Sequence, residues 1–116
     1  MADIPKRVMR LLRECAAAAH EEDLRRALLP IAEAFKRWEQ GGLGSGDLSE
    51  LIHQFHQGPA RELYVRNDTN DIEAPVAYAI VTGVLDRKEV PAEVRDHVAR
   101  LIQFYQSEQG EAARDE

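Results

Sequence analysis

Apolar residues recur at helical spacing along most of the chain, and no stretch alternates with the period of two that is typical of a strand. Near the amino terminus, apolar side chains fall on one stripe at about 100° per residue, and charged side chains fall opposite. This pattern predicts a helix that Asp3 caps and that runs from Pro5 to Ala19, and a second helix from Glu21 to Glu39. Near His20 the pattern allows either a turn or a continuous helix. Pro30 lies on the polar side of the second helix and predicts a bend there rather than an end.

The apolar stripes of these two helices are the strongest in the chain. The first consists of Ile4, Val8, Leu11, Leu12, Cys15, Ala18 and Ala19, and the second of Leu24, Ala27, Leu28, Ile31, Phe35 and Trp38. The register of Phe35 and Trp38 with their neighbours favours ordinary core positions. Large aromatic side chains also anchor protein interfaces, so an interface role stays open for both residues.

The middle of the chain contains two expected loops. Four glycines between positions 41 and 46 predict the first loop, and Asp47 with Glu50 resembles a capping box that starts a helix from Leu48 to about Gln57. The Gly58–Pro59 pair ends that helix and begins a new turn with Ala60, Leu63 and Tyr64 on its apolar side. The polar run from Asn67 to Asp71 predicts the second loop.

The last third of the chain predicts two further helices. The segment from Ile72 to Leu85 is apolar on most sides, which is typical of a central, enclosed helix. Pro91 begins a final helix that turns Val94, Val98, Leu101, Ile102 and Tyr105 inward. The sequence therefore predicts an all-α fold, a compact bundle of about five short helices in a single domain over residues 1–105. Residues 106–116 are expected to form a polar, acidic, flexible tail.

The amino-acid composition limits the classes of protein to which the chain can belong. A chain of 116 residues can bury one core, and its single cysteine excludes an intramolecular disulfide. The longest uncharged run extends from Ala74 to Leu85 and is shorter than the roughly 20 apolar residues that a spanning helix requires. The net charge of −6 argues against binding of nucleic acid by the whole surface. We expect a cytoplasmic protein without a membrane segment.

The segment from Glu50 to Glu62 concentrates most of the candidate chemistry. It contains two of the four histidines, a Gly–Pro break and an Arg–Glu pair. A corner of this kind suits recognition of another protein. The predicted partner-binding residues are His53, His56, Arg61 and Glu62.

A metal site is an alternative for the same segment. Glu50 and His53 have the Glu-x-x-His spacing of carboxylate-bridged sites in helical bundles, and His56 is a third possible ligand. Such a site needs a second copy of the motif, which only symmetric dimerisation could supply. We therefore favour a structural role for these side chains and expect no cofactor.

No other arrangement indicates catalysis. Cys15 lies in the middle of the first apolar stripe, where a thiol is an inert core group rather than a nucleophile. The residues after Asp68 lack the glycine and the last glutamate of a calcium loop. The glycine loop follows a helix and lacks the Lys–Ser/Thr pair of a phosphate loop. We favour a binding protein over an enzyme.

A second alternative is binding of a polyanion such as nucleic acid through the basic face of the first helix, formed by Lys6, Arg7, Arg10 and Arg13. Acidic residues follow this face, and no aromatic residue is interleaved with it to stack on bases. A solvated helix face is therefore the favoured interpretation.

The leading hypothesis is a protein-interaction or regulatory module without catalytic activity, which binds an unidentified protein and forms a homodimer.

Overall fold

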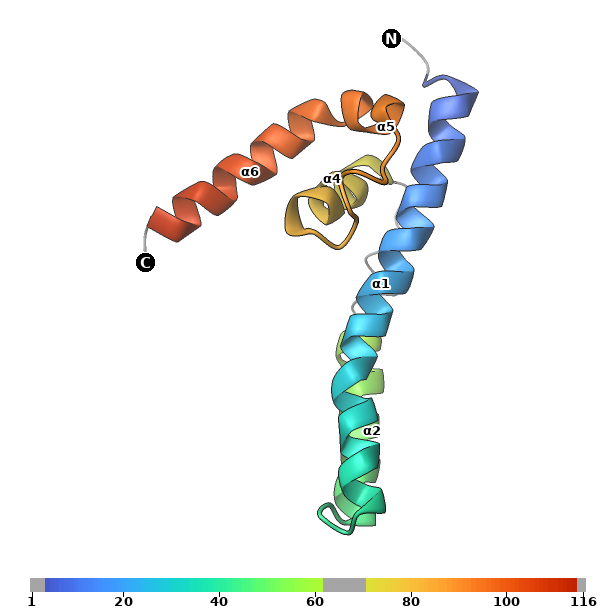
Figure 1. The fold of residues 1–116 in the computed structure, drawn as a ribbon, viewed down its shortest axis with the longest axis vertical. Coiled ribbons are helices and arrows are strands. Elements are labelled where there is room, and N and C mark those ends of the chain that lie inside the picture. Colours follow the sequence, from blue (N-terminus) through green and yellow to red (C-terminus); the bar gives the residue numbers. More distant parts are fainter. Residues whose placement is uncertain (1–3, 62–70, 115–116) are drawn as a thin grey trace. The chain divides into compact units, whose positions relative to one another are not determined.

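The computed structural model describes residues 4–61 and 71–114, and all regular structure in these ranges is helical (Figure 1). The helices are α1 (Lys6–Glu39), α2 (Ser45–Gln57), α4 (Glu73–Thr82), α5 (Ala92–His97) and α6 (Ala99–Arg114). The predicted all-α class is confirmed. No helix in the described ranges combines the length and the apolar character needed to cross a bilayer. The expected cap Asp3, the turn residues Leu63 and Tyr64 and the loop from Asn67 to Asn70 lie outside these ranges.

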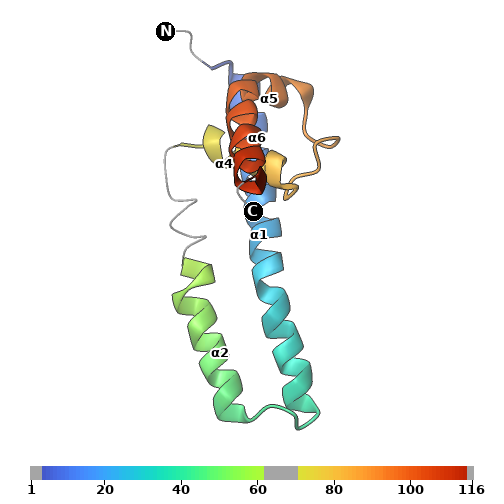
Figure 2. The ribbon, with the colours of Figure 1, turned by 90° about the vertical axis from the view of Figure 1, so that its left-hand side faces the viewer.

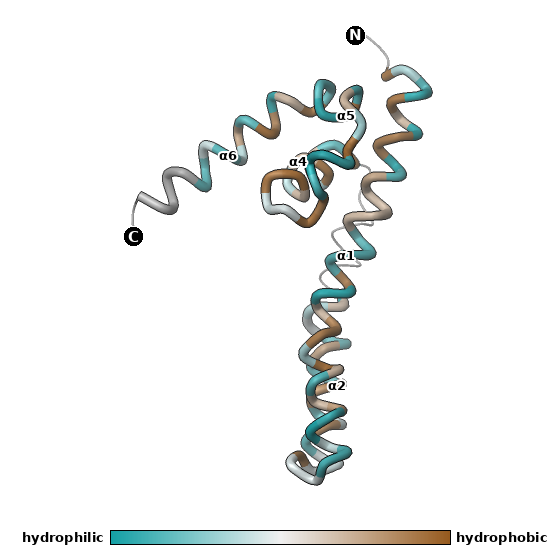
Figure 3. The backbone as a smooth tube through the Cα atoms, viewed as in Figure 1, coloured by the Kyte–Doolittle hydropathy of each residue, from teal (hydrophilic) through white to brown (hydrophobic). Residues whose placement is uncertain are grey.

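Helix α1 is continuous over 34 residues, so the two helices expected on either side of His20 are one. The sequence between Pro5 and Pro30 contains no glycine or proline, and its alanine-rich centre has a high helix propensity. The helix also continues through Pro30, as predicted. Figure 3 shows hydrophilic and hydrophobic positions alternating along its whole length.

A short glycine turn connects α1 to α2. Gly41 adopts a φ of +80°, which favours glycine, and its N–H donates to the Trp38 carbonyl oxygen at 3.0 Å. Helix α2 begins at Ser45, after Gly44, and no side chain caps it. The capping box predicted for Asp47 is therefore wrong. Asp47 lies in the first turn of α2, where a carboxylate interacts favourably with the helix dipole.

Helix α4 is the most enclosed helix of the described chain, as predicted. Four of its ten residues are buried, namely Val76, Ala77, Ala79 and Ile80. The Asp71 carboxylate accepts hydrogen bonds from the backbone N–H groups of Glu73 and Ala74 at 3.1 and 3.2 Å. It thereby provides acceptors for two N–H groups that have no partner within the helix. Gly83, with a φ of +81°, ends it.

The final predicted helix is divided in two. Helix α5 ends at His97, and α6 begins at Ala99 after a break at Val98. Helix α6 then runs to Arg114, into the residues that the sequence assigned to a polar tail. Glutamine, glutamate and alanine are good helix formers, which explains the added turns.

The chain forms two compact units. The first comprises residues 1–19 and 70–116. Its core joins the first turns of α1 to α4, α5 and α6 (Figure 1). The buried residues of this core are Leu12, Cys15, Val76, Ala77, Ile80, Val90, Val94, Val98 and Ile102. The inward positions predicted for the first and last helices are thus largely confirmed.

The second unit comprises residues 20–69. Its described part is an antiparallel hairpin, in which the second half of α1 lies beside α2 (Figure 2). Only Ala34 and Leu48 are buried among the described residues of this hairpin. Two helices side by side cannot enclose an interior, so most of its apolar side chains stay in contact with water.

Candidate protein-interaction surface

Five large apolar side chains of the described hairpin are exposed. Leu29 is 49% exposed and lies about 100° or more around α1 from the other exposed apolar residues of that helix, so we describe the remaining four together. Leu28, Phe35 and Trp38 of α1 are 43%, 41% and 39% exposed, and Ile52 of α2 is 40% exposed. The prediction that Phe35 and Trp38 are ordinary core residues is therefore wrong. The same holds for the core positions expected for Leu28 and Ile52. We call these four residues the hairpin face.

The two helices expose these residues on the same side of the hairpin. Ala34 and Leu48 are buried, so they mark the line along which α1 and α2 face each other. Trp38 follows Ala34 by four residues, and Ile52 follows Leu48 by four residues. In an antiparallel pair, equal displacements around the two helix axes lead to the same face, since the helices run in opposite directions. The hairpin face is therefore one surface.

Contacts within the hairpin hold its aromatic side chains in place. The Trp38 Nε1–H donates a hydrogen bond of 2.9 Å to the Ser45 Oγ, which lies at the start of α2. The rings of Phe35 and Trp38 meet edge to face, with centroids 6.3 Å apart and an interplanar angle of 89°. These contacts hold large apolar side chains in one conformation at the surface. Less side-chain entropy is therefore lost when a partner binds.

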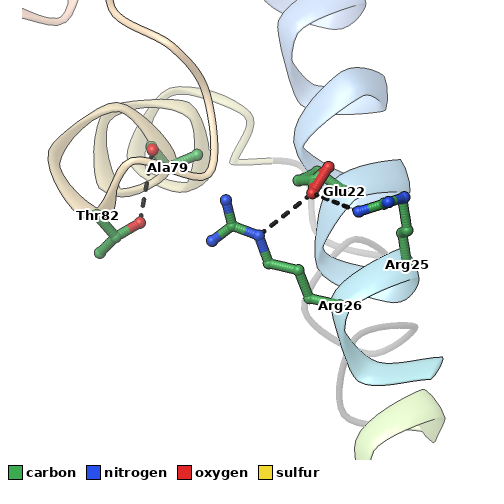
Figure 4. A network of polar contacts seen from close by, with 5 residues as sticks. All are labelled: Glu22, Arg25, Arg26, Ala79 and Thr82. Carbon is green, nitrogen blue, oxygen red and sulfur yellow. Dashed lines mark hydrogen bonds and ion pairs between the residues drawn. The ribbon is translucent and has the colours of Figure 1, made fainter. Parts of the chain in front are cut away.

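Charges of both signs border the hairpin face on α1. Glu21, Arg25, Lys36 and Glu39 are exposed along one edge of this helix, and we call them the charged edge. Arg25 lies 3.5 Å from Glu22, which is also 3.3 Å from Arg26 (Figure 4). These are long, exposed contacts of low energy, so they leave the Arg25 side chain able to engage a further carboxylate.

Aromatic side chains are also exposed in the first unit, but they contact one another. Tyr78 of α4 and Phe104 of α6 are 47% and 54% exposed. Both rings pack edge to face on Tyr105, each with centroids 5.4 Å apart. This cluster shields part of its own apolar surface. In α4, the Thr82 hydroxyl also lies 3.5 Å from the Ala79 carbonyl oxygen (Figure 4).

The predicted partner-binding corner adjoins the hairpin face. His53 and His56 are exposed on α2, and Arg61 is exposed in the helical residues 59–61, whereas Glu62 lies outside the described residues. His56 and Arg61 border one pocket of about 350 Å³ together with Gln57 and Ala60. Because His56 follows Ile52 by four residues on the same helix, this pocket lies next to the hairpin face.

The alternative metal ligands do not converge. The Glu50 carboxylate accepts a hydrogen bond of 3.3 Å from the Gln54 side-chain amide. Successive ligands at a spacing of three residues are displaced by about 60° around the helix, so Glu50, His53 and His56 spread over α2. In the described part of the chain, no three histidine, cysteine or acidic side chains form a group that could hold a metal ion.

The basic face of α1 is exposed, but one of its members is neutralised. Lys6, Arg10 and Arg13 extend from the helix into solvent. The Arg7 Nε–H lies 3.0 Å from each carboxylate oxygen of Glu93, which belongs to α5 of the same unit. This ion pair reduces the positive charge of the face on which polyanion binding would depend.

Cys15 is a core group, as predicted. It is 8% exposed and packs among the apolar residues of the first unit. Burial, with a smaller contribution from the Glu14 carboxylate, raises the pKa of the Cys15 thiol above its usual value of 9.0. A thiol in this state is a poor nucleophile at neutral pH.

Searches found no family model, no curated protein and no solved structure that matches the chain. The assignment of a function therefore rests on the geometry of the described residues.

Proposed function

We propose that the protein is a helical interaction module without catalytic activity, and that it binds a partner protein through the hairpin face. The exposure of Leu28, Phe35, Trp38 and Ile52 on one side of a two-helix hairpin carries this proposal. Apolar side chains that share one surface commonly mark a site of protein association.

The composition of the surface supports the same function. Tryptophan and phenylalanine are enriched at interfaces, and a central apolar group with a polar surround is the usual anatomy of a binding site. The hairpin face has this arrangement, with the charged edge on α1 and the exposed His53 and His56 on α2. The predicted corner of His53, His56 and Arg61 then extends the contact surface beyond Ile52, and Glu62 belongs to the same hypothesis.

Site-specific photo-crosslinking tests this function. A benzophenone amino acid replaces Ile52 on the hairpin face, and in a matched variant it replaces the exposed Lys88, which lies in the connection between α4 and α5. Irradiation in the native host cells is expected to give a discrete protein adduct from position 52 only. Adding Phe35→Asp to the position 52 variant is expected to remove that adduct. Equal labelling from both positions, or no adduct at position 52, would contradict the proposed function.

A further inference from the structure

We infer that the protein binds a small aliphatic monoamine in a pocket of the first unit. The pocket has a volume of about 240 Å³ and lies between α1 and the connection from α4 to α5, at residues 85–91. It shares no residue with the hairpin face, so amine binding is a second property that does not depend on the proposed function. The order of apolar and acidic side chains, from the bottom of the pocket to its mouth, supports this ligand.

Two ordered segments form the walls of the pocket. The wall on α1 consists of Leu11, Glu14, Cys15 and Ala18. Their spacings of three and four residues place them on one side of the helix. In the opposite wall, the Glu89 N–H donates to the Asp86 carbonyl oxygen at 2.9 Å, and the Leu85 N–H donates to the Ala79 carbonyl oxygen at 3.0 Å. These bonds hold the connection in place, so the pocket is formed before a ligand enters.

The bottom of the pocket is apolar, whereas its mouth is acidic. Cys15 and Val90 line the bottom, since both are buried and belong to the core of the first unit. Glu14, Asp86 and Glu89 are exposed and line the mouth. Among the described residues, no lysine, arginine or histidine lines the pocket. A ligand that matches both parts has a hydrocarbon chain and a cationic end.

Glu14 and Glu89 are the carboxylates best able to hold the cation. One Asp86 carboxylate oxygen already accepts a hydrogen bond of 3.0 Å from the Lys88 backbone N–H. The charge of Glu14 also acts inside the pocket. Burial, with a smaller contribution from the Glu14 carboxylate, raises the pKa of the Cys15 thiol. The same negative charge attracts a cation at the mouth.

The acidic mouth suits an organic cation rather than a metal ion. In the described ranges, no three histidine, cysteine or acidic side chains form a group that could hold a metal. An ammonium group needs no such convergence, because each of its three N–H groups can donate to a separate carboxylate.

The apolar bottom specifies which amine fits. A monoamine enters with its hydrocarbon chain first and leaves its ammonium group at the mouth. A diamine, or a lysine side chain of another protein, would carry a charge into the apolar bottom, where an unpaired ammonium is costly. The volume is also below the roughly 300–1,000 Å³ of sites for drug-sized ligands, so the hydrocarbon chain is short.

Four probes with the same number of carbon atoms test this ligand class. Pentylamine, titrated into the full chain, is expected to shift the methyl resonances of Leu11 and Val90 in nuclear magnetic resonance spectra. Cadaverine, the corresponding diamine, and pentanoate are expected to bind about tenfold more weakly, because of the second buried charge and the like charge, respectively. Pentanol lacks the charge and is expected to bind about fivefold more weakly. Cadaverine or pentanol that binds as tightly as pentylamine would overturn the inference, as would no binding of pentylamine.

Substitutions locate the bound amine. Glu14→Gln and Glu89→Gln each remove one charge from the mouth and are expected to weaken pentylamine binding about two- to fivefold, with pentanol binding unchanged. Glu108→Gln, at an exposed position of α6, is the matched control and is expected to bind as the wild type does.

Filling the pocket gives an independent measurement. Ala18→Leu places a larger side chain at the mouth and is expected to abolish pentylamine binding. Ala17→Leu is the matched control, because the exposed Ala17 does not line the pocket. Circular dichroism confirms that each variant is helical. Undiminished binding by Ala18→Leu, or equal losses in Glu14→Gln and Glu108→Gln, would place the amine elsewhere and overturn the inference.

Discussion

The indole Nε1–H of Trp38 donates a hydrogen bond of 2.9 Å to the Ser45 hydroxyl, and this bond ties the last turn of α1 to the first residue of α2. It closes the glycine turn with a side-chain contact, in addition to the backbone bonds from Gly41 and Gly42. The position and the orientation of the Trp38 ring on the hairpin face therefore depend on a residue of the neighbouring helix.

Removal of the Ser45 hydroxyl is expected to loosen this end of the hairpin. Ser45→Ala leaves the indole N–H without its protein acceptor, and a hydrogen bond of this kind contributes about 0.5–1.5 kcal/mol to stability. Trp38 is the only tryptophan of the chain, so its fluorescence during urea unfolding reports on the hairpin alone. The exposed Ser49→Ala is the matched control and is expected to change stability little. Equal losses in the two variants would show that the hydrogen bond is not the cause.

The first unit is expected to respond to truncation in its core far more than at its surface. Leu12 is fully buried, so Leu12→Ala removes packed methyl groups and is expected to cost about 2–5 kcal/mol. Phe104 is 54% exposed, and Phe104→Ala is expected to cost less than about 1.5 kcal/mol, mainly through its ring contact with Tyr105. Thermal unfolding followed by circular dichroism measures both. A larger loss of stability for Phe104→Ala than for Leu12→Ala would contradict the difference in burial between the two side chains.

Helical periodicity was sufficient to predict the core of the first unit. Leu12 and Cys15 from α1 and Val94 and Ile102 from the last helices were placed inward by their spacing, and all four are buried. The hydrophobic periodicity alone could not decide whether the chain turns or continues as a helix near His20, because both structures preserve the apolar stripe. The helix is continuous there because the alanine-rich segment has a high helix propensity and contains no glycine or proline.

The hairpin face was the part of the candidate site that the sequence could not predict. Periodicity identifies which side of a helix is apolar, but it does not count the neighbours that cover that side. Phe35 and Ile52 therefore had the same pattern as true core residues, although only one helix lies beside each of them in the described hairpin. The partner-binding prediction for His53 and His56 stays a prediction, and the structure adds that Ile52 lies beside them.

The ion pair between Arg7 and Glu93 is expected to contribute little to stability. Both side chains are largely exposed, at 65% and 46%, so solvent screens the interaction, and the single Nε–H of Arg7 is shared between the two carboxylate oxygens of Glu93. A double-mutant cycle with Arg7→Ala and Glu93→Ala is expected to give a coupling energy below about 1 kcal/mol. The coupling should fall as salt is added. The same cycle with Arg10→Ala provides a control, and an equal coupling there would argue against a specific pair.

The raised pKa of the Cys15 thiol predicts how the stability of the protein changes at alkaline pH. Burial, followed by the Glu14 carboxylate, raises the pKa of its thiol above 9.0, so the folded state disfavours the thiolate. The unfolded chain loses the thiol proton first, because its thiol retains the lower pKa. The stability that the protonated Cys15 maintains is therefore full below the unfolded pKa and is lost as the pH rises from about 9 through the folded pKa.

Two measurements check this prediction. The free energy of unfolding, followed in urea from neutral to alkaline pH, is expected to decrease above pH 9 more steeply in the wild type than in Cys15→Ala, which lacks the titrating group. A thiol reagent at pH 8 is expected to label Cys15 slowly in the folded protein and rapidly in urea, since the native side chain is only 8% exposed. Rapid labelling of the folded protein would place the thiol at the surface and remove the physical cause of its raised pKa.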